Sequence, residues 1–149
     1  MATTPAWAGD ACSLVEAFRA KAISPTEALE ATLAAVEASV LGSVCHVDTE
    51  AARAAAAVAD VSLPFGGVPI AVKELEAVAG WPAAYGTALL DGTIWDHTAV
   101  HVERLRAAGA IPVVQTTASE LGLVAYTSTK VHGTTGNPWD PTLTPGGSS

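Results

Sequence analysis

The sequence predicts an α/β fold in which helices cover a mixed β-sheet. Segments with apolar residues every three or four positions alternate with short apolar runs that are typical of buried strands. The chain has 149 residues and half of them are hydrophobic, which is enough to bury a real core. Much of this hydrophobic fraction is alanine, which favours helices packed closely against a flat partner.

Two helices are predicted in the first forty residues. The run Ser13-Leu-Val-Glu16 has the pattern of a capping box and predicts a short helix that ends near Ala22. The run Ser24-Pro-Thr-Glu27 repeats the pattern, with proline at the first helical position, where its lack of an N–H costs nothing. The second helix continues through apolar residues at spacings of four and three: Leu29, Leu33 and Val36.

A strand, a helix and a second strand are predicted next. Val44–Val47 is a short strand, and an alanine-rich helix begins at Asp48 or Thr49 and ends near Asp60. After a glycine-containing turn, the compact apolar run Val68–Val72 is typical of a buried strand. The proline within this run belongs at the start of a strand or at the edge of a sheet.

The second half of the chain predicts one more helix and one more buried strand. The helix begins at Asp96 or Thr98 and ends at Gly109, a glycine suited to a left-handed cap. Ile111–Val114 is the buried strand, and Thr117–Glu120 has the pattern of a third capping box. The last quarter of the chain is predicted to be irregular, and loops of this length are often functional.

Charge and composition exclude several classes of function. The net charge is -8 and the basic residues are scattered, which argues against a surface that binds nucleic acid or an anionic membrane. No positively charged leader and no uncharged run of about 20 residues is present, so we expect a cytoplasmic protein without membrane contact. Cys12 and Cys45 lack the paired spacing of a zinc site, and we expect reduced thiols, with a disulfide left open.

Lys73 and the final four residues are the strongest candidates for chemistry. Lys73 ends an apolar run; the ordinary interpretation is a lysine that reaches solvent, but burial would favour its neutral form, which is a general base. Glu74 should point to the opposite face of the strand. Gly146-Gly147-Ser148-Ser149 is either a flexible turn or a loop whose glycines let hydroxyls approach a small substrate. The loop lacks the lysine and spacing of a phosphate-binding loop.

The histidines and aromatic residues favour structural interpretations. His97 and His101 are four apart on the predicted helix, a spacing that can bind a metal, but no acidic ligand pattern accompanies them and an exposed face is favoured. His132 lies in a glycine-rich loop and could contact a substrate, although such residues are usually solvated. No basic stripe accompanies the larger aromatic residues, which are therefore expected to pack inside the protein: Trp81, Tyr85, Trp95 and Trp139.

An ordered set of short motifs resembles the amidase signature family over nearly the whole chain. Each motif is weak alone, but their order and spacing together are specific. The motifs are Gly67-Val-Pro-Ile-Ala-Val-Lys73, Ala79-Gly80, Tyr85-Gly-Thr87, Leu105-Arg-Ala-Ala-Gly-Ala110, Asn137-Pro-Trp-Asp140 and Thr144-Pro-Gly-Gly-Ser-Ser149.

The resemblance implies hydrolysis of carboxamides by a Ser–Ser–Lys triad, without a metal or an organic cofactor. By match, Lys73 is the base and Ser148 the bridging serine, while Ser149, Gly146 and Gly147 support the network or the substrate. Lys73 would take a proton through Ser148 from a second serine. That serine would attack the amide carbon, and backbone amides would stabilise the oxyanion.

The resemblance also implies that the fold is incomplete in this chain. In the family the nucleophile and the oxyanion hole lie further along, so residues 1–149 are expected to be the N-terminal part of one domain. We expect a small amide substrate. We expect activity only together with the C-terminal remainder, which could be a separate chain. The sequence leaves the oligomeric state undetermined, and a homodimer is one option. A glutamyl-tRNA amidotransferase A-type subunit and an inactive fragment are the alternatives.

Two parts of the sequence depart from the family pattern. Glu74 stands where aspartate is usual, and Gln115-Thr116-Thr117 stands where lysine-threonine-asparagine is common. These departures either tune the substrate or have no effect. Because the lysine-threonine-asparagine pattern is absent, a free-standing amidase is favoured over the amidotransferase component.

Overall fold

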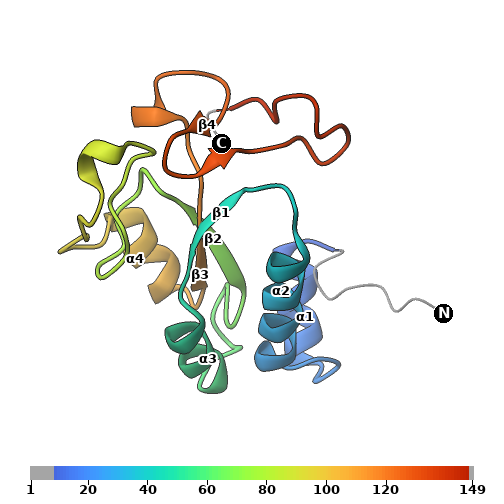
Figure 1. The fold of residues 1–149 in the computed structure, drawn as a ribbon. Helices are drawn as coiled ribbons and strands as arrows, with labels where there is room; N and C mark the ends of the chain where they lie inside the picture. Colours follow the sequence, from blue (N-terminus) through green and yellow to red (C-terminus); the bar gives the residue numbers. More distant parts are fainter. Residues whose placement is uncertain (1–8, 148–149) are drawn as a thin grey trace. The chain divides into compact units, whose positions relative to one another are not determined.

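The computed structural model describes residues 9–147. Figure 1 shows short helices and strands in the first 116 residues, followed by a mainly irregular segment. The elements, with η for 3-10 helices, are α1 (Ala11–Arg19), α2 (Pro25–Ala38), β1 (Val44–Val47), α3 (Thr49–Ala57), β2 (Pro69–Lys73), η2 (Ala88–Leu90), α4 (Val100–Ala107), β3 (Ile111–Thr116), η3 (Glu120–Gly122), β4 (Ser128–Thr129) and β5 (Gly133–Thr134).

The described chain divides into two compact units. The first contains 9–38, Asp48–Ile70 and Glu103–Val113. The second contains Ser39–Val47, Ala71–Val102 and 114–147. Strands β2 and β3 and helix α4 each have residues in both units.

The helices of the first unit begin at side-chain caps. Helix α1 is capped by Asp10, whose Oδ1 accepts from the Ser13 backbone N–H at 2.7 Å, so the prediction of Ser13 as the cap was wrong. Ser13 lies inside the helix and its hydroxyl donates to Asp10. The capping box of α2 is confirmed, because Glu27 accepts from the Ser24 N–H at 2.9 Å and donates its own N–H to the Ser24 hydroxyl. Helix α3 begins at Thr49, one of the two predicted starts, and Asp48 caps it.

The core of the first unit lies where α1 and α2 meet the residue that precedes β2. Its buried members are Leu14, Val15, Phe18, Ala28 and Val68. A Cβ at Gly67 would lie 2.7 Å from the ring of Pro25, and the φ of Gly67 is +87°, so the position requires glycine.

The strands form a sheet in the order β1-β3-β2. β1 runs antiparallel to β3, with Val47 opposite Val114, and an irregularity falls between Val44 and His46. The predicted mixed sheet is confirmed, because β2 runs parallel to β3. The Ile111 N–H donates to the Val68 carbonyl near one end of the pair. Near the other end, the Glu74 N–H donates to the Thr116 carbonyl.

β2 and β3 lie close to the positions predicted from the sequence. Pro69 is the first residue of β2, the position that a strand proline requires. Five of the six residues of β3 are buried, as expected for the central strand. The prediction for β2 was less accurate, since Val72 is buried but Ala71 is exposed.

The structure corrects three local predictions in the second unit. Thr117–Glu120 is not a capping box, because η3 begins after Ser119, whose side chain makes no capping bond. Helix α4 begins at Val100, so His97 precedes it. The packing prediction holds for Trp81, which is 2% exposed, and fails for Trp139, which is 91% exposed.

Across residues 9–147, no helix combines the length and the apolar character that a bilayer crossing would need.

Candidate functional site

An open pocket of about 270 Å³ lies in the second unit at the end of β2. This volume is close to the lower end of the range found for small-molecule sites. Its described lining residues are rich in hydroxyl groups and include one charged side chain, that of Lys73. They are Ser43, Lys73, Thr116, Thr117, Ala118, Ser119, Val124, Thr127, Thr135, Pro145, Gly146 and Gly147.

The pocket brings together three of the predicted site residues. Lys73, Gly146 and Gly147 all line it, although the lysine is separated from the glycines by nearly half the chain. Gly146 has a φ of +84°, and its N–H donates to the Thr144 hydroxyl at 3.1 Å. Ser148 and Ser149 lie outside the described residues.

Lys73 reaches the pocket because it is the last residue of β2. The chain turns directly after it, with the Glu76 N–H donating to the Lys73 carbonyl at 2.9 Å. The alternation of side chains along a strand then separates two neighbouring charges. Lys73 lines the pocket, whereas Glu74 is buried and is not among the lining residues.

Backbone and hydroxyl hydrogen bonds join the segment Thr116–Ser119 to two other loops. The Thr117 N–H donates to the Ser43 carbonyl at 3.0 Å, and the hydroxyls of Thr117 and Thr135 are 2.8 Å apart. The Thr135 hydroxyl donates in turn to the Gly42 carbonyl at 2.9 Å. These bonds fix one wall of the pocket, which we call the threonine wall (Thr116–Ser119).

The buried carboxylate of Glu74 makes three hydrogen bonds near the pocket. It is 1% exposed, and its Oε1 accepts from the Ala118 N–H at 2.6 Å. Its Oε2 accepts from the Gly86 N–H at 2.9 Å and lies 3.0 Å from the Nε2 of His132, in the tautomer that donates. The His132 side chain is 17% exposed. The expectation of a solvated histidine at this position was therefore wrong.

Sequence reasoning missed this contact because its partners are 58 positions apart. The sequence did contain one local signal. Glu74 directly follows an apolar strand and should point to the face opposite Lys73. A carboxylate buried on that face must accept hydrogen bonds from nearby donors. No local signal marks His132 as the donor.

Gln115 joins β3 to neighbouring loops and does not line the pocket. Its side chain is buried, and its Nε2 donates to the Pro82 carbonyl at 2.9 Å. The thiol of Cys45 donates to the Gln115 carbonyl at 3.4 Å. Two residues of this segment depart from the family pattern: Thr117 lines the pocket, whereas Gln115 supports the strand.

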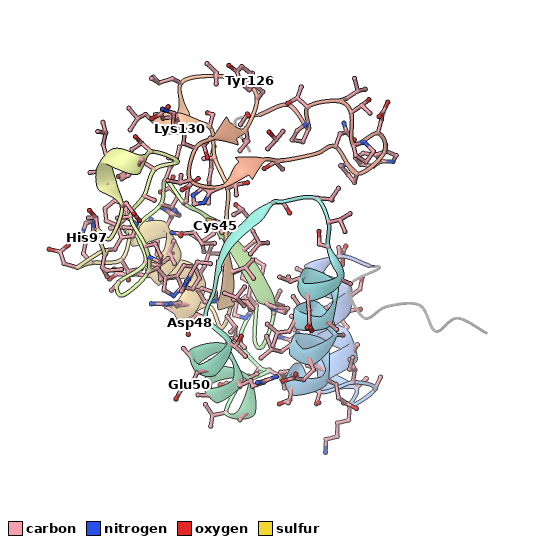
Figure 2. The ribbon with its side chains drawn as sticks, viewed as in Figure 1. Cys45, Asp48, Glu50, His97, Tyr126 and Lys130 are labelled. Carbon is pink, nitrogen blue, oxygen red and sulfur yellow. The ribbon has the colours of Figure 1, made fainter. Side chains whose placement is uncertain are left out.

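Cys45 belongs to β1 (Figure 2). Its side chain lies close to those of Glu74 and His132. One possible ligand atom from each of the three residues lies within 4.8 Å of the others, a spacing that could hold a metal ion. Each side chain already has a protein hydrogen-bond partner. These bonds account for the cluster as a hydrogen-bonded network.

The two cysteines should differ sharply in reactivity. Both are free thiols, with Cys12 exposed. Burial, and then the charge of Glu74, raise the pKa of Cys45 to about 12. At pH 8 only about 1 in 10⁴ Cys45 side chains is then a thiolate, the form that reacts. Iodoacetamide at pH 8 should therefore alkylate Cys12 first, and Cys45 only after unfolding, as measured by peptide mass spectrometry. Equal labelling rates in the folded protein would contradict this assignment.

His97 and His101 have separate partners on the surface. The Nδ1 of His97 lies 2.7 Å from the Asp96 carboxylate, and the Nε2 of His101 lies 3.2 Å from that of Glu76. Both imidazoles are more than half exposed. This arrangement agrees with the exposed interpretation favoured by the sequence.

Comparison with known proteins identifies the family. The family model described as Amidase matches residues 27–149. The chain is 40% identical over 139 residues to the A-type subunit of glutamyl-tRNA(Gln) amidotransferase from Anaeromyxobacter dehalogenans (strain 2CP-C), covering 87% of this chain and 28% of that protein. It is 36% identical over 136 residues to the protein of the same name from Rhodopirellula baltica, of which it covers 27%.

Solved structures give the same result. The structure of 6-aminohexanoate cyclic dimer hydrolase complexed with substrate matches with a TM-score of 0.89 and 33% identity, over 97% of this chain and 30% of that one. A bacterial aryl acylamidase of the amidase signature family matches with a TM-score of 0.88 and 25% identity, over 95% and 31% of the two chains. The chain thus spans less than a third of these relatives. From its motifs, its mixed sheet and these matches, the chain belongs to the amidase signature family.

Proposed function

We propose that this chain supplies the lysine and the bridging serine of an enzyme that hydrolyses carboxamides with a Ser–Ser–Lys triad. Lys73 is the base and Ser148 the bridging serine, and residues 1–149 are the N-terminal part of one amidase domain. The observation that carries the proposal is the shared pocket. Lys73 and the two glycines that precede Ser148 line one hydroxyl-rich space.

The chemistry follows from these roles. The nucleophilic serine, in the remainder of the domain, passes its proton to the Ser148 oxygen as Ser148 passes its own proton to the neutral amine of Lys73. The serine oxygen bonds to the amide carbon, and backbone N–H groups stabilise the resulting oxyanion. The carbon–nitrogen bond then breaks, and ammonia or an amine leaves with the proton from Lys73. Water hydrolyses the acyl ester to a carboxylate.

The lining of the pocket supports this role for Lys73. The other described lining residues are uncharged, and several carry hydroxyl groups that could take part in a proton path. The neighbouring Glu74 is turned away and bonded to other donors. The hydroxyls of the wall can donate to or accept from a polar amide, and the pocket size suits a small substrate.

A reconstitution experiment tests this proposal. The 149-residue chain is mixed or co-expressed with the remainder of the domain, and ammonia release from acetamide, benzamide and glutamine is measured. We expect turnover from the combined parts and none from the 149-residue chain alone, because the proposed nucleophile lies in the remainder. Turnover by the 149-residue chain alone would contradict the triad assignment.

One observation favours a second candidate, an ammonia-supplying component of an amidotransferase. Identity is 40% to a protein named as the A-type subunit of glutamyl-tRNA(Gln) amidotransferase. This candidate predicts that glutamine is preferred over simple amides and that added ammonium salts rescue an inactive triad variant in the complex. A free-standing amidase would hydrolyse simple amides without a partner, and ammonium would rescue nothing.

A further inference from the structure

We propose that Glu74 and His132 are a positioning pair for the lysine pocket. The carboxylate holds the threonine wall at a fixed place beside the end of β2, and His132 attaches the β4–β5 hairpin to the same carboxylate. The inference rests on the proposed function for its effect on catalysis. The pair itself rests on contacts within the second unit, and neither residue is among those that line the pocket.

The carboxylate gathers three segments that are distant in sequence. Its donors are the backbone of Gly86, the backbone of Ala118 and the ring of His132. An ionised carboxylate only accepts hydrogen bonds, so it can be paired with all three of these donors. A buried carboxylate that loses a donor is left with an unsatisfied lone pair, so each contact resists displacement of the segment that provides it.

Two contacts of Glu74, one from its backbone and one from its side chain, determine where Lys73 lies relative to the threonine wall. Glu74 follows Lys73 directly, and its N–H donates to the carbonyl of Thr116, the first residue of the wall. Its side chain then holds the N–H of Ala118, two residues further along the wall. Glu74 is thus hydrogen-bonded to the threonine wall at two points. Its neighbour Lys73 can move relative to the wall only if one of these two bonds breaks.

The turn around Gly86 packs closely against the threonine wall. A Cβ at Gly86 would lie 3.0 Å from the Ala118 carbonyl oxygen, and the φ of Gly86 is +66°. Tyr85, just before it, has a φ of 51°, which is uncommon for a residue other than glycine. This close approach is held by the Glu74 bond to Gly86 and by the bond from the Leu121 N–H to the Tyr85 carbonyl.

His132 provides a second attachment for the hairpin. The two residues at the base of the hairpin, Thr127 and Thr135, line the pocket and are joined by a backbone bond of 3.0 Å. At the turn, the His132 N–H donates to the Thr129 hydroxyl and its ring reaches Glu74. The hairpin is therefore fixed both at its base and at its turn, which limits the movement of Thr127 and Thr135 in the pocket.

The test compares His132→Leu with His132→Gln in the reconstituted enzyme. Leucine removes the donor, and we expect kcat to fall by roughly 10–100-fold with KM changed less, because small displacements around reacting groups cost rates of this order. Glutamine can donate to the same carboxylate oxygen and should restore most of kcat. His101→Leu, at an exposed histidine paired with Glu76, is the matched control and should leave kcat unchanged.

A second measurement does not depend on catalysis. Hydrogen–deuterium exchange of the same protein should show faster exchange in peptides that contain Gly86 and Ala118 in His132→Leu, with α1 and α2 unchanged. Exchange that does not change, or a His132→Gln variant as slow in catalysis as His132→Leu, overturns the pair. If the wild-type assembly hydrolyses no amide, the proposed function fails while the exchange result still decides whether the pair exists.

Discussion

Lys73→Met is expected to lower kcat for amide hydrolysis in the assembled enzyme by about 10²–10⁴-fold, the range for loss of a general base. Methionine keeps an unbranched apolar stem of similar length, so the packing at the end of β2 should survive. The amine that receives the proton is lost. Ammonia release at saturating substrate measures the effect.

The chain offers a matched control for this variant. Lys130 is exposed on a loop of the same unit (Figure 2) and does not line the pocket. Lys130→Met should therefore keep the wild-type rate. A Lys73→Met enzyme that retains more than about a tenth of the wild-type kcat would show that Lys73 is not the base, since base removal costs at least ~10²-fold.

Ser148→Ala is expected to reduce kcat by about the same factor, roughly 10²–10⁴-fold. Alanine removes the hydroxyl that relays the proton and leaves Lys73 without a path to the nucleophile. Ser149→Ala should have a smaller effect, because Ser149 is proposed to support the network without transferring a proton. Both rates come from the same ammonia assay, and circular dichroism shows whether the variants fold. A larger loss at Ser149 than at Ser148 would reverse the two roles.

The helix starts show where local sequence was enough and where it was not. Ser24 and Glu27 form the predicted capping box, because no competing acceptor precedes them. At α1 the same pattern misled, because Asp10 lies three residues before Ser13 and its carboxylate takes the Ser13 N–H. The Ser13 hydroxyl, and then its N–H, lower the pKa of Asp10, which favours the charged form that complements a helix N-terminus.

Thr117 and His132 were predicted wrongly because their hydrogen-bond partners are distant in the sequence. The Thr117 hydroxyl was expected to cap a helix, but it lies 2.8 Å from the Thr135 hydroxyl, 18 positions away in the sequence. His132 was expected in solvent, but Glu74 accepts its ring N–H. Neither pairing leaves a periodic trace in the sequence, because hydroxyls and loop histidines have many partners of similar energy.

The pocket itself was predicted in part. Lys73 follows from an apolar run that ends in a lysine, and Gly146-Gly147 from its glycines and the family motif. The hydroxyls contributed by Ser43 and Thr127 had no signal, because they come from loops whose path depends on the β1–β3 pairing and on the hairpin. A reactive side chain at the end of a strand can be predicted from the neighbouring sequence. The residues that face it across the pocket come from distant loops, so their positions depend on the tertiary structure.

The most direct test of the central claim is the double variant Lys73→Met with Ser148→Ala, assayed for ammonia release beside each single variant. If the two residues form one proton path, removing either breaks it, and the double variant should be no slower than the slower single variant. Losses that multiply, so that the double variant is slower than either single variant by the full factor of the other, would show that Lys73 and Ser148 act independently. That result would contradict the assignment of both to one triad.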